Sequence, residues 1–267
     1  MNFDFSDDQK LLQEQARKFL TDKCSRKLVR SVLDNNNNQY SKELWQQVVD
    51  MGWTATAIPE EYGGLGLGML ELCVIAEELG RSLAPIPFSS SIYIFAEFLK
   101  AYGSDEQKKQ YLPKIASGEF IGSFAFPETK GSPRANNLNS KVENNKLSGK
   151  KLPVSDGQVA DVLIVAANSD NNQNHNSLSL YIVETNQDGV KEKLLDTLDP
   201  TRPSSEIEFN DASCSPLGEK GEGWSMIENI LNRAAVLFAF EQVGGAQVAL
   251  DEAKKYSIER YAFGKPI

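Results

Sequence analysis

Histidine and cysteine are scarce in this sequence. Its 267 residues include one histidine, His175, and three cysteines, Cys24, Cys73 and Cys214. His175 lies in a polar run over residues 171–176, where a solvated side chain is the simpler interpretation, so neither a histidine-activated nucleophile nor a zinc site is expected. The cysteines lack Cys-x-x-Cys spacing, which argues against a disulfide scaffold and indicates thiols in a reducing compartment. We therefore expect no metal site and a cytoplasmic protein.

Positive charge and long apolar runs are also lacking. Lysine and arginine total 28 against 37 aspartate and glutamate residues, which gives a net charge of −9. This balance argues against nucleic acid or an anionic membrane surface as the main partner, although it leaves room for a small anionic ligand. No apolar run approaches the length of a membrane span, and Met1–Asp8 lacks the basic start and apolar core of a secretory signal. With 40% apolar residues the chain can bury a sizeable core in one or two domains.

The first part of the chain, residues 1–120, has the pattern of an all-helical domain. Apolar residues recur there every three or four positions, and serine or aspartate precedes several of these segments, as is typical of helix starts. The predicted helices run over Gln9–Lys23 behind Asp7, from Ser41 to Val49, over Met69–Leu83, from Ala96 towards Ala101, and onward from Ser104.

The pattern changes over residues 121–216. Short apolar runs rich in β-branched residues replace the helical periodicity, and polar turns such as Glu143–Lys146 separate them. These runs are Ile121–Phe126, Val159–Ala167, Leu178–Val183 and Ile207–Phe209. They predict a central antiparallel β-domain.

The last part, residues 217–267, begins with a glycine-containing loop and continues as one long helix from about Ser225. A helix with an apolar stripe must bury it against other elements. The order of helices, strands and helix predicts an α+β fold with segregated elements and not a doubly wound sheet. The stripe follows the helical period at Met226, Ile230, Ala234, Leu237, Phe238, Ala246, Ala249 and Leu250.

Several motifs spread along the chain point to one family. Each is weak alone, but their number, order and spacing together are specific. They are Ile58–Gly66, Ala76–Arg81, Tyr111–Glu119, Asp199–Arg202, Leu217–Trp224, Glu241–Gln247 and Glu259–Ile267. With these motifs the chain resembles the acyl-CoA dehydrogenase family of flavoproteins from its first residues to its last.

The resemblance implies a fold and a reaction. The fold would be an N-terminal helical domain over 1–120, a central β-barrel-like domain over 121–216 and, over 217–267, the first long helix of a C-terminal four-helix bundle. Most of that bundle would be absent, so the chain is expected to be C-terminally truncated. The reaction would be FAD-dependent α,β-desaturation of an acyl-CoA thioester, in which a carboxylate removes the α-proton and the flavin accepts the hydride. The expected partners are other subunits in a homo- or hetero-oligomer and an electron-transfer flavoprotein or a similar acceptor.

The resemblance also places cofactor contacts in the β-domain. The backbone at Phe124 and Phe126 would reach the flavin ring. Pro127 stands where the family has a threonine, and it offers neither a hydroxyl nor an N–H. Ser132 matches a serine near the flavin phosphate and the CoA moiety, so it is a candidate for both cofactor and substrate binding.

Five further positions match residues of the family's binding sites. Pro153 replaces a tryptophan beside the flavin, and Ser155 keeps a hydroxyl where the family has a threonine. Arg233 matches an arginine that helps to line the acyl-CoA cleft. Arg260 and Phe263 match a pair that contacts the FAD of the neighbouring subunit, with the arginine on the pyrophosphate.

No residue is identified as the catalytic base. Most family members carry the base as a glutamate in a region that follows residue 267, and a minority place it directly before the arginine matched by Arg233. That position is Asn232, whose amide cannot accept a proton at neutral pH. Glu228 and Glu241 lie on the same predicted helix, but both are more simply interpreted as solvent-facing or helix-pairing carboxylates. The chain alone is therefore expected to be inactive.

Three interpretations stay open. The chain can be part of an active acyl-CoA dehydrogenase, a non-catalytic or divergent subunit of a hetero-oligomeric dehydrogenase, or a CoA-ester binding module without redox activity. The altered flavin loop and Asn232 favour the second interpretation. The sequence also leaves open whether the acyl group is a fatty acyl chain or a sterol side chain.

Overall fold

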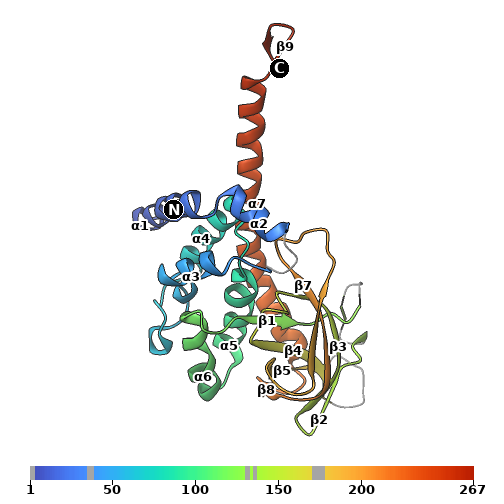
Figure 1. Ribbon diagram of the computed structural model, residues 1–267. Coiled ribbons are helices and arrows are strands. Elements are labelled where there is room, and N and C mark those ends of the chain that lie inside the picture. The colour runs from blue at the N-terminus through green and yellow to red at the C-terminus, as the bar shows by residue number, and fades with distance from the viewer. Residues whose placement is uncertain (1–3, 35–38, 130–132, 135–136, 170–177) are drawn as a thin grey trace.

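Figure 1 shows a group of helices beside a sheet, with one long helix that contacts both and continues past the N-terminal helices. Ser132 and His175, which were singled out in the sequence, lie outside the residues that the structure describes. The computed structural model describes residues 4–34, 39–129, 133–134, 137–169 and 178–267.

Helices build the first part of the molecule. They are α1 (Asp7–Lys23), α2 (Arg26–Leu33), α3 (Lys42–Asp50), the 3-10 turns η1 (Trp53–Ala55) and η2 (Glu60–Tyr62), α4 (Met69–Ser82), the π-helix η3 (Ser89–Phe95), α5 (Ala96–Tyr102) and α6 (Asp105–Ala116). The five predicted helices are confirmed, with small differences at their ends. α2 and η3 were not predicted.

The start of α1 depends on a capping box. Ser6 is the N-cap: its Oγ accepts a hydrogen bond from the Gln9 N–H (3.2 Å), and Gln9 Oε1 accepts one from the Ser6 N–H (3.0 Å). Asp7, which the sequence suggested as a cap, lies in the first turn, where its charge favours the helix dipole.

An eight-stranded sheet forms the second part. Its strands are β1 (Gly122–Ala125), β2 (Lys141–Glu143), β3 (Lys146–Ser155), β4 (Val162–Asn168), β5 (Leu178–Glu184), β6 (Val190–Leu195), β7 (Ser204–Ser213) and β8 (Ser215–Leu217). They follow the order β6-β7-β3-β2-β4-β5-β8, and β1 pairs with β4 off this path. β4 and β5 are buried along nearly their whole length, which explains their continuous apolar sequences.

The α+β class is confirmed, but the sheet is mixed and not wholly antiparallel. β1 and β2 each pair with β4 in parallel, whereas the other pairs described in this sheet are antiparallel. The long connection through β2 and β3 allows β1 and β4 to run in the same direction. Among the described residues the strand path runs from β6 to β8 without closing, so the expected term barrel-like applies only loosely.

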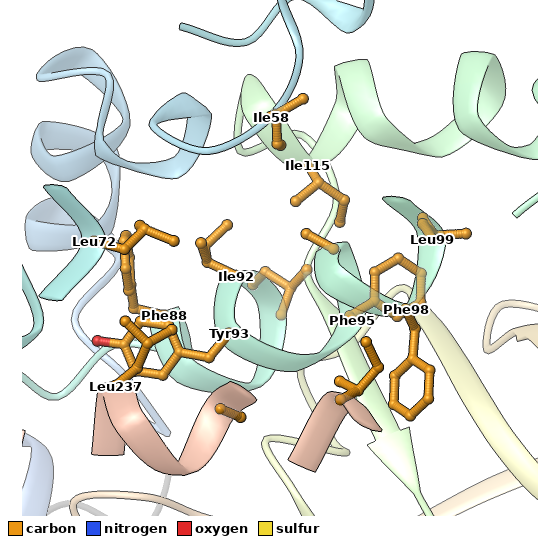
Figure 2. Close-up of a cluster of buried hydrophobic side chains, with 14 of the residues drawn as sticks. Ile58, Leu72, Phe88, Ile92, Tyr93, Phe95, Phe98, Leu99, Ile115 and Leu237 are labelled. Atoms are coloured by element: carbon orange, nitrogen blue, oxygen red, sulfur yellow. The ribbon is translucent and has the colours of Figure 1, made fainter. Parts of the chain in front are cut away.

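Two clusters of buried apolar residues make up the core. The larger joins the helices to α7, and Figure 2 shows Leu237 of α7 beside Phe88 and Tyr93 from the region of η3. The Tyr93 ring packs edge-on against both Phe88 and Phe238, with ring centroids 5.6 Å apart in each pair. The smaller cluster lies within the sheet. The larger cluster therefore connects the N-terminal helices to α7.

The last helix, α7 (Gly223–Glu259), has 37 residues. Its last part extends away from the body of the molecule (Figure 1), and a short hairpin of β9 (Tyr261–Ala262) and β10 (Lys265–Pro266) follows it. Within the described ranges, no helix has both the length and the apolar character needed to cross a membrane. The buried residues of α7 are Gly223, Met226, Ile227, Ile230, Ala234, Leu237, Glu241 and Gly244.

Candidate functional site

β1 and the residues directly after it lie alongside the last part of β3, in the opposite direction. Ser123 Oγ donates a hydrogen bond to the Ser155 carbonyl (2.6 Å), although the two residues are 32 positions apart. The Leu152 N–H donates to the Pro127 carbonyl (2.8 Å). We call this junction of residues 123–127 with residues 151–156 the β1–β3 seam. It brings together the predicted cofactor residues Phe124, Phe126, Pro127, Pro153 and Ser155.

Pro153 and Ser155 lie on one face of β3. Both residues are exposed and Val154 between them is buried, as the alternation of side chains along a strand requires. An apolar ring and a hydroxyl therefore lie next to each other on the open face of the seam. The Ser155 hydroxyl can donate or accept a hydrogen bond, whereas Pro153 offers only apolar contact.

Aromatic side chains attach β1 to the helices. The Phe124 ring lies 4.9 Å from that of Phe98 and 5.7 Å from that of Phe126, measured between centroids. Phe126 in turn lies 6.0 Å from Trp224 at the start of α7. Because these side chains serve packing, a ligand at this strand would meet main-chain groups of Phe124 and Phe126.

A buried ion pair, which the sequence did not reveal, supports the seam. The fully buried Lys151 Nζ donates to the Phe126 carbonyl (3.2 Å) and to Glu128 Oε1 (2.7 Å). Burial lowers the pKa of Lys151 to about 8, against the attraction of Glu128. Glu128 also accepts the backbone N–H groups of Asn139 (2.5 Å) and Ser140 (2.9 Å). The Lys151–Glu128 pair therefore attaches both ends of this loop, which follows β1, to strand β3.

The carboxylates of α7 differ in their surroundings. Glu228 is exposed, as is Asn232. Glu241, by contrast, is 9% exposed, and its Oε2 accepts a hydrogen bond from Arg202 (2.5 Å). The solvent-facing interpretation of Glu241 was therefore wrong, because the residue lies on the packed side of α7. An ion pair with Arg202 engages one oxygen of the carboxylate, Oε2.

Arg233 lies beside the buried Glu97 of α5. One guanidinium nitrogen is 2.7 Å from Glu97 Oε2, and Lys100 Nζ is 2.5 Å from Glu97 Oε1. The Glu97 side chain is 1% exposed, and that of Arg233 is 42% exposed. Arg233 thus helps to neutralise a buried carboxylate and also faces solvent.

Arg260 and Phe263 lie at the tip of α7. Figure 1 places the β9–β10 hairpin far from β1 and β3, so these residues do not meet the seam within one chain. The Arg260 guanidinium stacks over the Tyr256 ring at 5.4 Å, and the Phe263 side chain is fully exposed. Both residues therefore face outward from this chain.

Comparison with protein families gives a match over the N-terminal part of the chain. The model described as "Acyl-CoA dehydrogenase, N-terminal domain" matches residues 6–119. Among curated proteins, a glutaryl-CoA dehydrogenase from Desulfococcus multivorans is 32% identical in an alignment that covers 100% of this chain and 72% of that protein.

Solved structures agree over the whole chain. A complex of glutaryl-coenzyme A dehydrogenase with glutaryl-CoA has a TM-score of 0.89 at 30% identity, covering 100% of this chain and 70% of that one. Butyryl-CoA dehydrogenase from Megasphaera elsdenii has a TM-score of 0.88 at 26% identity, with coverage of 100% and 73%. The chain belongs to the acyl-CoA dehydrogenase family.

Proposed function

We propose that the chain binds FAD at the β1–β3 seam and serves in the α,β-desaturation of an acyl-CoA thioester. The observation that carries the proposal is the seam itself, because it joins the two separate segments in which family resemblance expects flavin contacts. The relatives are named for different acyl groups, glutaryl and butyryl among them, so the proposal covers acyl-CoA thioesters as a class.

The residues of the seam fit a flavin through main-chain groups, one hydroxyl and an apolar ring. Main-chain groups at Phe124 and Phe126 would face the ring system, and the Ser155 hydroxyl would donate to it or accept from it. Pro127 and Pro153 would contribute apolar contact only. When bound, FAD supplies the acceptor for the hydride. Ser132, proposed for the flavin phosphate and the CoA moiety, lies outside the described residues.

The cofactor site would need a second subunit. We propose that Arg260 and Phe263 contact the FAD of a neighbouring subunit, with the guanidinium on the pyrophosphate. Their outward position at the tip of α7 supports this assignment. Arg233, partly exposed beside Glu97, is proposed to line the acyl-CoA cleft. An electron-transfer flavoprotein or a similar acceptor would then reoxidise the flavin.

A non-catalytic or divergent subunit is the second candidate function. It is favoured by two side chains of α7: Asn232 is an amide, and the buried Glu241 is paired with Arg202. Such a subunit would bind FAD or a CoA ester and leave proton abstraction to a partner. A CoA-ester binding module without redox activity is the third.

One titration series separates these functions. FAD is added to the purified chain, visible absorption records bound flavin, and glutaryl-CoA or butyryl-CoA is then added without oxygen. Loss of the flavin absorption on adding a thioester supports the dehydrogenase. Bound FAD that stays oxidised in this chain, which has no identified base, supports the non-catalytic subunit only if adding a base-bearing acyl-CoA dehydrogenase subunit then reduces the flavin. Binding of a thioester without FAD supports the module. Ser155→Ala should weaken FAD binding, and Ser213→Ala at the end of β7 is the matched control.

A further inference from the structure

Arg202 occupies the connection between β6 and β7, beside the β1–β3 seam. Its guanidinium donates hydrogen bonds to Ser89 Oγ of η3 and to Glu241 Oε2 of α7, the latter at 2.5 Å. These partners are 113 and 39 positions away in the sequence, so one side chain ties three separate elements together. The sequence motif Asp199–Arg202 had suggested family membership but no role for the arginine.

The same connection holds the end of β3. The Asp156 N–H donates to the Pro203 carbonyl (2.7 Å), and Asp156 Oδ2 accepts a hydrogen bond from Ser90 Oγ (2.5 Å). Asp156 has a φ of +54°, a left-handed conformation that costs energy for a residue other than glycine. Ser89 and Ser90 are neighbours in η3. One turn of the π-helix therefore holds both Arg202 and Asp156.

The positive charge of Arg202 compensates two buried carboxyl groups, those of Asp156 and Glu241. Asp156 is 3% and Glu241 is 9% exposed. Burial raises the pKa of both carboxyl groups, that of Asp156 to about 6, and the positive charge of Arg202 opposes the rise at each. The buried Tyr93 hydroxyl of η3 also faces Glu241, and its own pKa is raised by burial and by that carboxylate. Without Arg202, two buried carboxylates would lose the cation that compensates them.

We infer that Arg202 is a positioning residue for the cofactor face of the seam. Arg202 fastens its own connection to η3 and α7, and through Pro203 this connection holds Asp156. Asp156 directly follows Ser155, so the guanidinium fixes where the Ser155 hydroxyl stands relative to β1. This inference deepens the proposed FAD site and rests on it, but its effect on the backbone of β3 can be measured without FAD.

The test uses the full chain with Arg202→Met and Arg202→Lys. The control is Arg26→Met, which breaks an exposed pair with Glu252, at side-chain exposures of 81% and 52%. Two quantities are measured: amide hydrogen exchange at Asp156, by NMR or mass spectrometry, and the Kd for FAD, by visible absorption. Arg202→Met should speed the exchange at least tenfold and raise the Kd at least tenfold. The lysine variant should fall between Arg202→Met and the wild type, and the control should change neither by more than about twofold.

A combined variant separates positioning from charge balance. Arg202→Met with Asp156→Asn and Glu241→Gln removes the buried charges while it keeps similar shapes. Positioning predicts restored thermal stability but fast exchange at residue 156 and weak FAD binding. Wild-type values of thermal stability, exchange and FAD binding in the combined variant would overturn the inference. Unchanged exchange in Arg202→Met would also overturn it. If Arg202→Met does not fold, the same measurements on Arg202→Lys and on the combined variant decide whether Arg202 positions the seam. Wild-type protein that binds no FAD contradicts the proposed function instead, and exchange then decides the role of Arg202.

Discussion

The two halves of α7 belong to one continuous helix but have different surroundings. Up to Gly244 the helix has a buried stripe that packs against α4 and the helical core. From Gly245 to Glu259 no residue is buried, and the large apolar side chains Leu250, Tyr256 and Ile258 are more than half exposed. We call these the packed half and the extended half.

The difference shows that regular backbone geometry does not report how much a residue stabilises the fold. In the packed half, apolar burial and close backbone contact stabilise the helix. In the extended half, the helix is held by helix propensity, by local side-chain bonds such as Gln247 Nε2 to Asp251 Oδ1 (2.9 Å), and by exposed ion pairs such as Arg26 with Glu252. Matched substitutions in the two halves should therefore differ greatly in effect.

The largest contrast is expected at two adjacent glycines where α7 crosses α4. A Cβ added at Gly244 would lie 2.0 Å from the Glu77 carbonyl oxygen, whereas at Gly245 the nearest atom would be the Gly80 carbonyl oxygen at 3.6 Å. Gly244→Ala should lower the free energy of unfolding by about 4 kcal/mol or more because the helices must separate. Gly245→Ala should raise it by roughly 0.5–1 kcal/mol through helix propensity. Urea denaturation measures both, and equal effects would show that the crossing is not close-packed.

The next contrast compares two leucines of α7. Leu237→Ala should cost about 3 kcal/mol, because Leu237 is fully buried beside Phe88 and Tyr93 (Figure 2). Leu250→Ala, at 63% exposure, should stay within about 0.5 kcal/mol of wild type. Thermal or urea unfolding measures both. A large loss at Leu250 would mean that the extended half is covered in solution, for example by a second copy.

The next prediction concerns how the free energy of unfolding depends on pH. Burial raises the pKa of Asp156, next to the packed half, from 3.8 to about 6. Because the folded-state pKa is the higher one, its contribution to stability is fully present below about pH 4 and is lost as the pH rises through 6. The loss amounts to about 3 kcal/mol at most. Asp156→Asn should remove this slope. The measurement is the free energy of unfolding between pH 4 and 7, and an unchanged slope would assign it to another group.

A small effect is also expected where α2 meets the extended half. Arg26 and Glu252 are 2.6 Å apart, yet both side chains are largely exposed. Arg26→Met should therefore change the free energy of unfolding by no more than about 1 kcal/mol, and the change should shrink further in high salt. Urea denaturation at two salt concentrations measures it. A loss as large as that of Leu237→Ala would contradict the assignment of the extended half as weakly held.

Local pattern predicted the elements that bury one apolar stripe or one apolar run. Thus α1 and α4 follow from helical periodicity, and β4 and β5 follow from their apolar runs. β6 was not predicted, because none of its six residues is buried and its central Lys-Glu-Lys is exposed. The short helix α2 and the π-helix η3 also escaped prediction. Parallel pairing of β1 with β4 depends on chain direction in space, and no local period records that.

The candidate site could be predicted only as far as the family resemblance reached. The resemblance indicated Phe124 and Ser155 as cofactor residues, and the sequence alone gave no reason to expect their hydrogen-bonded neighbourhood. The cluster around Arg202 was missed because its partners, Ser89 and Glu241, are distant in sequence and each has an ordinary local context. Charge compensation between distant residues is a property of the packed structure.

The crossing of α4 and α7 also has a consequence for biosynthesis. The surface of α4 at Gly80 lies against the backbone of a helix that is translated long after it, because Gly244 follows Gly80 by more than half of the chain. Protein synthesis adds about 5–20 residues per second, so the time between the synthesis of Gly80 and that of Gly244 is on the order of 10 to 30 s. During that time the side of α4 that contacts α7 is uncovered by α7, whereas α1, which also contacts α4, has already been translated. The N-terminal helices are therefore a nascent segment that we expect chaperones to protect until α7 emerges.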